Sequence, residues 1–320
     1  MKEKNLNQSR EKRAKSKKKI TKNIDQRVKG IKTLCSMLYA LCPLLFAKTK
    51  ERFMKRILVA GAAGRMGSRI IALSREYPDL KLTGAFEKKG HTGVGKDIGS
   101  IVGIGETGIR LSDSLEDIVD NADVIIDFTT PNSTKENIKV ASKKGRAMVI
   151  GTTGFSKEDM KEIDPLIRSI PCVMASNMST GVNLLLRILQ DVARVLGDEY
   201  DIEIIEAHHR LKKDAPSGTA LKMAQVIADA LHRSLDEVAV YTRKGLIGER
   251  AKKEIGIQTI RAGDIVGEHT VIFGGLGERI EFTHKASSRD TFARGALRAA
   301  LWIAGKPAGL YDMQDVLGLK

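Results

Sequence analysis

From Lys55 onward, short runs of aliphatic and β-branched residues alternate with longer stretches in which apolar positions recur at helical spacing. Short buried strands separated by helical stretches are typical of βαβ units, whose strands form a parallel sheet with helices on both faces. The pattern therefore predicts a Rossmann-like, doubly wound α/β domain in the first half of the chain. The predicted strands are KRILVA (55–60), LKLTGAFE (80–87), DVIIDF (123–128), RAMVI (146–150) and PCVMA (171–175).

The pattern changes after Thr180. A long helical stretch is followed by a strand and a second helix, and then by runs in which apolar and polar residues alternate. Alternation with a period of two predicts strands that bury one face, so we expect a second, α+β domain with an antiparallel or mixed sheet. A final helix is expected to return to the first domain. The predicted elements are helices at 181–197, 220–231 and 291–304 and strands at 200–206, 259–273 and 277–286.

The first 53 residues differ from the rest in charge. They hold 16 Lys and Arg against 4 Asp and Glu, and so carry +12 of the net charge of +15. Their polar, lysine-rich start predicts a disordered extension or a mis-assigned start, since Met54 leads directly into a strand. The near-neutral remainder argues against nucleic acid or a membrane as partner of the folded body. The expected parts are the extension (1–53), the first domain (54–178), the second domain (179–289) and the C-terminal return (290–320).

An apolar stretch lies inside the extension at residues 33–47. It falls short of the roughly 20 residues that a membrane helix needs, and Pro43 interrupts it. The long lysine-rich leader before it fits a signal or transit peptide poorly, although a targeting role stays open. The three cysteines, Cys35, Cys42 and Cys172, lack metal-ligand spacing and suit a reducing compartment. We therefore expect a cytoplasmic protein without a structural metal site.

A glycine-rich turn, GAAGRMG from Gly61 to Gly67, connects the first predicted strand to a helix. Glycines allow the backbone to approach a pyrophosphate closely, while the first N–H groups of the helix bind its charge. The second predicted strand ends at Glu87, 20 residues after Gly67, where an acid binds ribose hydroxyls in dinucleotide sites. Lys88 and Lys89 follow and suit a 2′-phosphate, so we expect this corner to accept NADH, NADPH or both. The simpler interpretation of Glu87, a solvated strand end, stays open.

Small polar turns end three further predicted strands. They are TTP at 129–131, GTTG at 151–154 and SNMS at 176–179. Ligands of a doubly wound sheet lie at the carboxyl ends of its strands, so we expect these turns to line the nicotinamide side of a cleft. For GTTG taken alone, a simple tight turn stays open as the alternative.

The most informative stretch is EAHHRLKKDAPSGTA, from Glu206 to Ala220, between a predicted strand and a predicted helix. Two His, one Arg and two Lys within six residues form a positive cluster, which is costly to bury without an anion. The small residues from Pro216 to Thr219 leave N–H groups and a hydroxyl free to hold a carboxylate. Histidine, and lysine with a lowered pKa, are common proton donors, so the stretch predicts reduction of a dianionic substrate. Asp214 is expected to orient the loop.

Together these motifs resemble the family of 4-hydroxy-tetrahydrodipicolinate reductases. EAHHRLKKDAPSGTA is very similar to the family's signature, and VAGAAGRMG, DFTTP, VIGTTGF, SNMSTGVN, TIRAGDIVGEHTVIF and HKASSRDTFA occur in the family's order. The resemblance covers essentially all of Met54 to Lys320. It implies a homotetramer that uses NADH or NADPH to reduce 4-hydroxy-tetrahydrodipicolinate, also called dihydrodipicolinate, to tetrahydrodipicolinate in lysine and diaminopimelate biosynthesis.

The resemblance also implies roles for single residues. His208 and Lys212 would donate protons, and His209, Gly218 and Thr219 would hold the small dicarboxylate substrate. Residues 54–178 would bind the dinucleotide, and 179–289 would bind substrate and form the oligomer. Two positions depart from the family, because Met178 stands where Phe is frequent and Lys88 where Arg is common. The implied cofactor contacts are Gly61, Ala62, Ala63, Gly64, Arg65, Met66, Glu87, Lys88, Gly151, Thr152, Thr153, Ala175, Ser176, Asn177 and Met178.

Two other interpretations compete with this one. An aldehyde dehydrogenase of the aspartate-semialdehyde kind also begins with a glycine-rich turn, but its chemistry needs a nucleophilic cysteine. Cys172 lies in an apolar strand, where an inert buried thiol is expected. A non-catalytic NAD(P)-binding sensor would use its basic extension to bind nucleic acid or a membrane. Removal of residues 1–53 would abolish the sensor's partner binding but would spare the turnover of a reductase.

Overall fold

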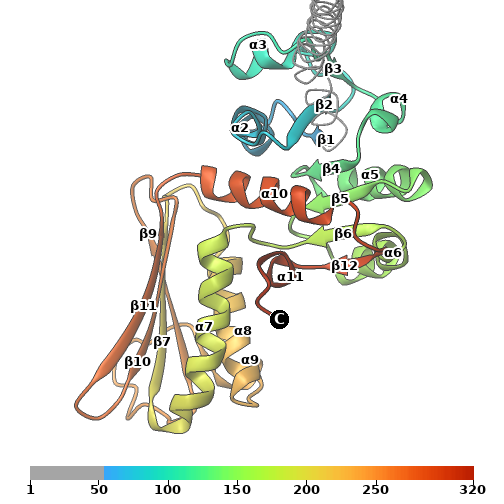
Figure 1. The fold of residues 1–320 in the computed structure, drawn as a ribbon. Coiled ribbons are helices and arrows are strands. Elements are labelled where there is room, and N and C mark those ends of the chain that lie inside the picture. The colour runs from blue at the N-terminus through green and yellow to red at the C-terminus, as the bar shows by residue number, and fades with distance from the viewer. Residues whose placement is uncertain (1–53) are drawn as a thin grey trace, which may run out of the picture. The chain divides into compact units, whose positions relative to one another are not determined.

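The computed structural model of the protein describes residues 54 to 320. The expected disordered extension, with its apolar stretch, lies outside the described residues. Residues 54 to 320 form one sheet of seven strands and one of five, both packed against helices (Figure 1). No helix within this range is long and apolar enough to cross a lipid bilayer.

The first sheet has the strand order β12-β6-β5-β4-β1-β2-β3, and every neighbouring pair in it is parallel. The order reverses between β1 and β4, and this switch point is where doubly wound sheets bind ligands. The strands are β1 (Lys55–Ala60), β2 (Leu80–Phe86), β3 (Leu111–Ser112), β4 (Val124–Asp127), β5 (Ala147–Ile150), β6 (Pro171–Met174) and β12 (Gly309–Tyr311).

Helices cover both faces of this sheet. Alternate residues of β1 face opposite cores: Ile57 and Val59 join the core that includes α2 and α10, while Leu58 joins the core that includes α5 and α6. Because α10 and β12 follow the second sheet in sequence, the chain returns to the first sheet at its C-terminal end. The helices are α2 (Arg65–Ser74), α3 (Ile98–Val102), α4 (Leu115–Ile118), η1 (Val119–Asn121), α5 (Pro131–Lys144), α6 (Lys157–Arg168), α10 (Asp290–Ile303) and α11 (Met313–Leu317).

The second sheet has the order β11-β10-β7-β9-β8 and is mixed, because β7 pairs antiparallel with β10 and parallel with β9. Helices α7 and α8 cover one face (Figure 1), where Ile202, Ile204 and Phe273 pack against them. The expected fold class, a Rossmann-like parallel sheet plus a second α+β part with a mixed sheet, is confirmed. The elements are α7 (Thr180–Leu196), η2 (Gly197–Glu199), β7 (Asp201–His208), α8 (Gly218–Ala230), α9 (Leu235–Val238), β8 (Ala239–Val240), β9 (Ile255–Arg261), β10 (Gly267–Gly274) and β11 (Arg279–Ala286).

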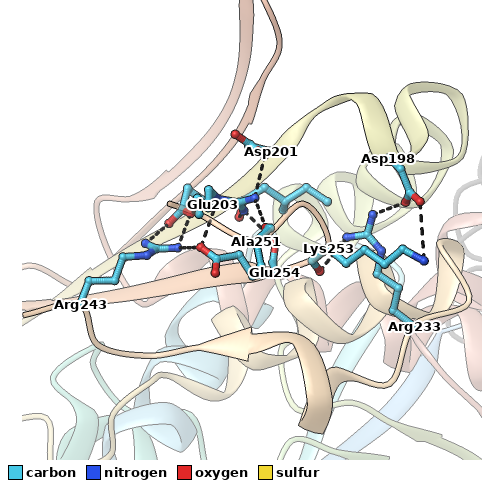
Figure 2. Close-up of polar contacts among 10 residues, drawn as sticks. Asp198, Asp201, Glu203, Arg233, Arg243, Ala251, Lys253 and Glu254 are labelled. Carbon is cyan, nitrogen blue, oxygen red and sulfur yellow. Dashed lines mark hydrogen bonds and ion pairs between the residues drawn. The ribbon is translucent and has the colours of Figure 1, made fainter. Parts of the chain in front are cut away.

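The long segment between β8 and β9 is held to the second sheet by a cluster of ion pairs (Figure 2). Arg243 donates to both carboxylate oxygens of Glu203 on β7, at 2.9 and 2.7 Å, and to Glu254 at 2.6 Å. Arg250 donates to Glu203 at 3.1 Å. A Cβ on Gly256 would lie 1.9 Å from a Glu203 oxygen, so this glycine makes room for the cluster. Since side chains alternate along a strand, the cluster lies on the face opposite α7 and α8.

Candidate functional site

The glycine turn lies between β1 and α2, beside the switch point of the first sheet. Gly61 has a φ of +66°, a conformation that favours glycine. A Cβ on Gly67 would lie 2.1 Å from the carbonyl oxygen of Gly61, so α2 packs closely against the turn only because this side chain is missing. Gly64 caps α2 without a side-chain hydrogen bond. The first N–H groups of α2 are therefore left for an external acceptor, and the turn fits a pyrophosphate.

Glu87 follows β2 directly and lies beside this turn. Its Oε1 accepts a hydrogen bond from the N–H of Ala63 at 3.3 Å, and its Oε2 accepts one from the N–H of Lys88 at 3.1 Å. The side chains of Lys88 and Lys89 are exposed. The structure therefore brings the acid and the glycine turn together, with two cations next to them; the acid suits ribose hydroxyls and the cations suit a 2′-phosphate.

A buried carboxylate organises the turns that follow β4 and β5. Asp127 is fully buried and accepts hydrogen bonds from the Thr129 hydroxyl at 2.7 Å, the Thr134 hydroxyl at 3.1 Å and the Asn137 amide at 2.8 Å. The Thr134 hydroxyl also lies 2.8 Å from the hydroxyl of Thr152. This network fixes the TTP turn against the GTTG turn, and no local pattern in the sequence indicates it.

The other expected cofactor residues differ in accessibility. Thr153 and Ser176 are exposed at strand ends, and Gly151 packs against the Phe128 ring, which a Cβ would approach to 2.1 Å. Ala62 and Met178 are instead buried, with 0% and 1% of their surface exposed, in the core that includes α10. The structure thus places these two residues behind the turns, where they support the backbone.

Asn177 connects the first sheet to the second part of the protein. It follows β6, and its Nδ2 donates to Oγ1 of Thr219, in the first turn of α8, at 3.0 Å. Its own carbonyl accepts a hydrogen bond from the Asn183 side chain at 2.8 Å. One hydrogen bond therefore joins an expected cofactor residue to an expected substrate residue. A cavity of about 570 Å³ begins beside this pair and continues between α7, α8 and the C-terminal residues.

The two histidines of the loop have different surroundings. His208 is the last residue of β7 and is 9% exposed, and its Nδ1 lies 2.5 Å from Oε2 of Glu206. His209 is half-buried and lines a cavity. The Nζ of Lys212 donates to the carboxylate of Asp214 at 2.9 and 2.8 Å, and this hydrogen bond lowers the pKa of Asp214. Asp214 thus orients the side chain of a candidate proton donor.

Glu206 is the centre of the buried part of this site. It is fully buried, and its carboxylate accepts two hydrogen bonds from Arg261, both at 2.9 Å, and one from the Thr259 hydroxyl at 3.1 Å. Burial raises the pKa of the Glu206 carboxyl, but hydrogen bonds from Arg261 and His208 outweigh it and hold the pKa below its ordinary value. Burial lowers the pKa of His208, and Glu206 opposes this shift only in part.

The start of α8 is tied to the same cluster. Ser217 caps the helix, since its Oγ accepts the N–H of Ala220 at 3.1 Å, and the same Oγ lies 3.0 Å from Nε2 of His269. His269 is 3% exposed, and burial lowers its pKa to about 4, so its ring is neutral at pH 7. The rings of His269 and His208 meet edge to face, with centroids 5.2 Å apart. The helix start is thus held by buried groups on the second sheet.

A cavity of about 790 Å³ lies where the histidine loop meets the start of α2. Four of its cationic side chains, Arg65, Arg210, Lys213 and Arg289, have no carboxylate partner among residues 54–320, whereas Lys212 is paired. Unpaired cations around one cavity attract an anion. Arg65 belongs to the glycine turn and is the first residue of α2. The cavity therefore borders both the predicted dinucleotide site and the predicted substrate site. No group of His, Cys, Asp and Glu within residues 54–320 is arranged to hold a metal ion.

The histidine loop is visible as a motif in the sequence, whereas the residues that lie behind it are not. Glu206 and His208 are two positions apart on a strand, so their shared face was a readable signal. Arg261 could not be predicted in this way, because it contacts Glu206 only through the pairing of β7 with β9, which places Arg261 beside His208. His269 likewise reaches Ser217 through a strand partner, β10, that no local pattern identifies.

Cys172 lies buried in β6, and burial raises the pKa of its thiol to about 12. A thiol that stays protonated is a poor nucleophile, so the expectation of an inert thiol is confirmed. Within residues 54–320 the aldehyde dehydrogenase interpretation therefore lacks its nucleophile.

Comparison with known proteins agrees with the motifs. The family models described as dihydrodipicolinate reductase, N-terminus, and dihydrodipicolinate reductase, C-terminus, match residues 55–178 and 181–317. The 4-hydroxy-tetrahydrodipicolinate reductases of Syntrophobacter fumaroxidans and Geobacter sulfurreducens are 57% and 55% identical over 267 residues, which are 83% of this chain and 100% of each relative. A dipicolinate-bound dihydrodipicolinate reductase from Paenisporosarcina sp. TG-14 is 25% identical with a TM-score of 0.63, covering 82% of this chain and 98% of that one. The chain therefore belongs to the dihydrodipicolinate reductase family.

Proposed function

We propose that the protein is an NAD(P)H-dependent reductase that converts 4-hydroxy-tetrahydrodipicolinate into tetrahydrodipicolinate in lysine and diaminopimelate biosynthesis. One observation carries the proposal: Arg65 of the glycine turn and the unpaired cations of the histidine loop line the same cavity. Relatives that are 53% to 57% identical and bear this name support it. In this proposal residues 54–178 and 290–320 bind the dinucleotide, and 179–289 bind the substrate.

The residues at the switch point fit the dinucleotide. Gly61 to Gly64 and the first N–H groups of α2 would hold the pyrophosphate, and Glu87 the adenosine ribose, with Lys88 beside it for a 2′-phosphate. The turns at 151–153 and 175–177 would line the nicotinamide. NAD(P)H, when bound there, supplies a hydride.

The substrate site is built for two carboxylates. The N–H groups of Gly218 and Thr219 lie at the start of α8, where the helix dipole favours an anion, and His209 lines the cavity of the histidine loop. The unpaired cations Arg210 and Lys213 raise the local concentration of a dianion before it binds. Two carboxylates on a small ring would therefore be recognised by charge and by directed hydrogen bonds.

The protein itself must supply protons. Conversion of the 4-hydroxy compound to tetrahydrodipicolinate removes the hydroxyl as water and adds one hydride and one proton. His208 and Lys212 are the proposed donors, because they are the titratable cations of the loop that Glu206 and Asp214 hold in place. Positioned acids of this kind contribute about 10²-fold to 10⁴-fold to a rate.

The proposal includes a homotetramer in the reducing cytoplasm, in keeping with the free thiol of Cys172. The face of the second sheet opposite α7 and α8 carries Ile205, Ile260 and Ile272 on neighbouring strands, and Ile260 is 47% exposed. Such a face is suited to packing against a second sheet. Light scattering should give a mass four times the 35.0 kDa of one chain, and a stable 35.0 kDa species would contradict the tetramer.

The experiment for the main proposal follows the absorbance of NADH and of NADPH while the full chain is given substrate made in place from pyruvate and aspartate semialdehyde by the preceding synthase. We expect oxidation that depends on both the synthase and the chain. Tight NADH binding without any oxidation would contradict the proposed reaction.

A further inference from the structure

The two oxygens of the Glu206 carboxylate divide their partners between two parts of the site. Oε2 lies 2.5 Å from Nδ1 of His208, while Oε1 accepts the N–H of Ser217 at 3.1 Å. Arg261 bridges both oxygens, and the Thr259 hydroxyl adds a further bond to Oε1. One buried carboxylate therefore contacts both the candidate proton donor and the cap of the helix that would hold the substrate.

This contact determines which nitrogen of His208 carries a hydrogen. Because the pKa of Glu206 is lowered, its carboxylate is ionised and can only accept, so Nδ1 must be the donor. The other nitrogen, Nε2, makes no hydrogen bond to any of residues 54–320. A Cβ on Gly267 would lie 3.1 Å from Nε2, so the glycine keeps the space beside this nitrogen free of a side chain.

We propose that Glu206 is a positioning residue for the reduction: it holds His208 with Nδ1 protonated and Nε2 available, and through Ser217 it couples that orientation to the start of α8. The inference rests on the proposed function, since it concerns the use of His208 as an acid. Hydrogen-bonded partners that fix the tautomer of a catalytic imidazole act in this way in other enzymes.

Removal of the Glu206 charge should change the pKa of His208 in a predictable direction. The charged and titratable groups that face His208 are Glu206 on β7, Arg261 on β9, His269 on β10 and Lys212 in the loop. Burial, Lys212 and Arg261 disfavour the imidazolium of His208, while the neutral ring of His269 carries no charge, so Glu206 alone opposes the loss of the proton. An acid works only while protonated, and the rate falls as the pH rises through its pKa. Without the Glu206 charge this fall must begin at a lower pH.

The test is the pH profile of kcat for the full chain carrying Glu206→Gln. We expect the descending limb to move down by about one pH unit or more, with the Kd for NADH unchanged within twofold. The matched control is Glu203→Gln, which makes the same change on the same strand but on the opposite face, where the carboxylate pairs with Arg243. That control should leave the limb in place. A uniform loss of kcat without a shifted limb in Glu206→Gln would overturn the proposal.

A second measurement does not depend on turnover. NMR of ¹⁵N-labelled histidine in the wild-type chain reports the tautomer of neutral His208, which is assigned by its absence in His208→Gln. We expect the hydrogen on Nδ1, and a hydrogen on Nε2 would overturn the proposal. If the wild type fails to oxidise NADH but shows the Nδ1 tautomer, the proposed function has failed and the positioning of His208 has not.

Discussion

Replacement of Gly67 by alanine tests the fit of the dinucleotide turn. The new Cβ would lie 2.1 Å from the carbonyl oxygen of Gly61, about 1.3 Å short of the 3.4 Å at which ordinary contact begins, and 2.8 Å from the Cα of Ala62. Both neighbours are backbone atoms, so α2 must move away from the turn. Overpacking of this kind costs about 1–3 kcal/mol, and the better helix propensity of alanine offsets up to about 1 kcal/mol of it.

The larger effect is expected on cofactor binding, because a shifted α2 no longer aims its first N–H groups at the pyrophosphate. Loss of one charge-assisted hydrogen bond is worth about 1.5–3 kcal/mol, so titration calorimetry should show NADH binding at least tenfold weaker. Gly84→Ala is the matched control, since its nearest neighbours would be side-chain atoms rather than backbone: Leu58 Cδ1 at 3.0 Å and Cγ at 3.1 Å, and Ile118 Cδ1 at 3.4 Å. If Gly67→Ala binds NADH within twofold of the wild type, the turn is not the pyrophosphate site.

Three further predictions concern the other parts of the site. His208→Gln should lower kcat by at least about 10²-fold with NADH affinity unchanged, whereas Lys213→Gln should keep most of its kcat. Steady-state kinetics measure kcat and calorimetry measures NADH affinity. A large loss of NADH affinity in His208→Gln would contradict the role of His208 as a proton donor. Glu87→Ala should weaken NADH about tenfold and NADPH much less in the same titration, and an equal loss of both would remove Glu87 from the ribose site. Burial holds the pKa of His269 at about 4, below the ~6.5 of an unfolded histidine, so the unfolded state binds more protons between these values and stability falls as the pH drops. Between pH 7 and pH 5 the free energy of unfolding, measured with urea, should fall by about 2 kcal/mol less in His269→Gln than in the wild type. Equal falls in the two proteins would refute this.

Local patterns were sufficient for the elements that carry the motifs. The strand β1, the glycine turn and α2 were predicted together, because a run of aliphatic residues and the glycines after it are read from neighbouring positions. The alternating run at 259–273 spans the end of β9 and most of β10, since the residues at 262–266 turn the chain between them. Period-two alternation continues across such a turn, so the pattern by itself did not separate the two strands.

The interior of the site could not be predicted in the same way. In the sequence, Asp127 is only a polar residue near the end of a predicted strand. The packing of α5 on the sheet brings Thr134 and Asn137 to its carboxylate. The residues of the positive cluster in the histidine loop also differ in their surroundings. His208 is buried and contacts Glu206, whereas Lys213 is exposed. Contacts of this kind depend on tertiary packing between segments that are distant in the sequence or on different faces of one strand.

The measurement that tests the central claim most directly is transfer of deuterium from NADH to the product. The full chain is supplied with NADH deuterated at C4, in separate reactions on each face, and the tetrahydrodipicolinate formed is examined by mass spectrometry. We predict one deuterium per product molecule from one of the two labelled cofactors and none from the other. A product without deuterium from either cofactor, or no product at all while NADH remains bound, would contradict the proposed hydride transfer.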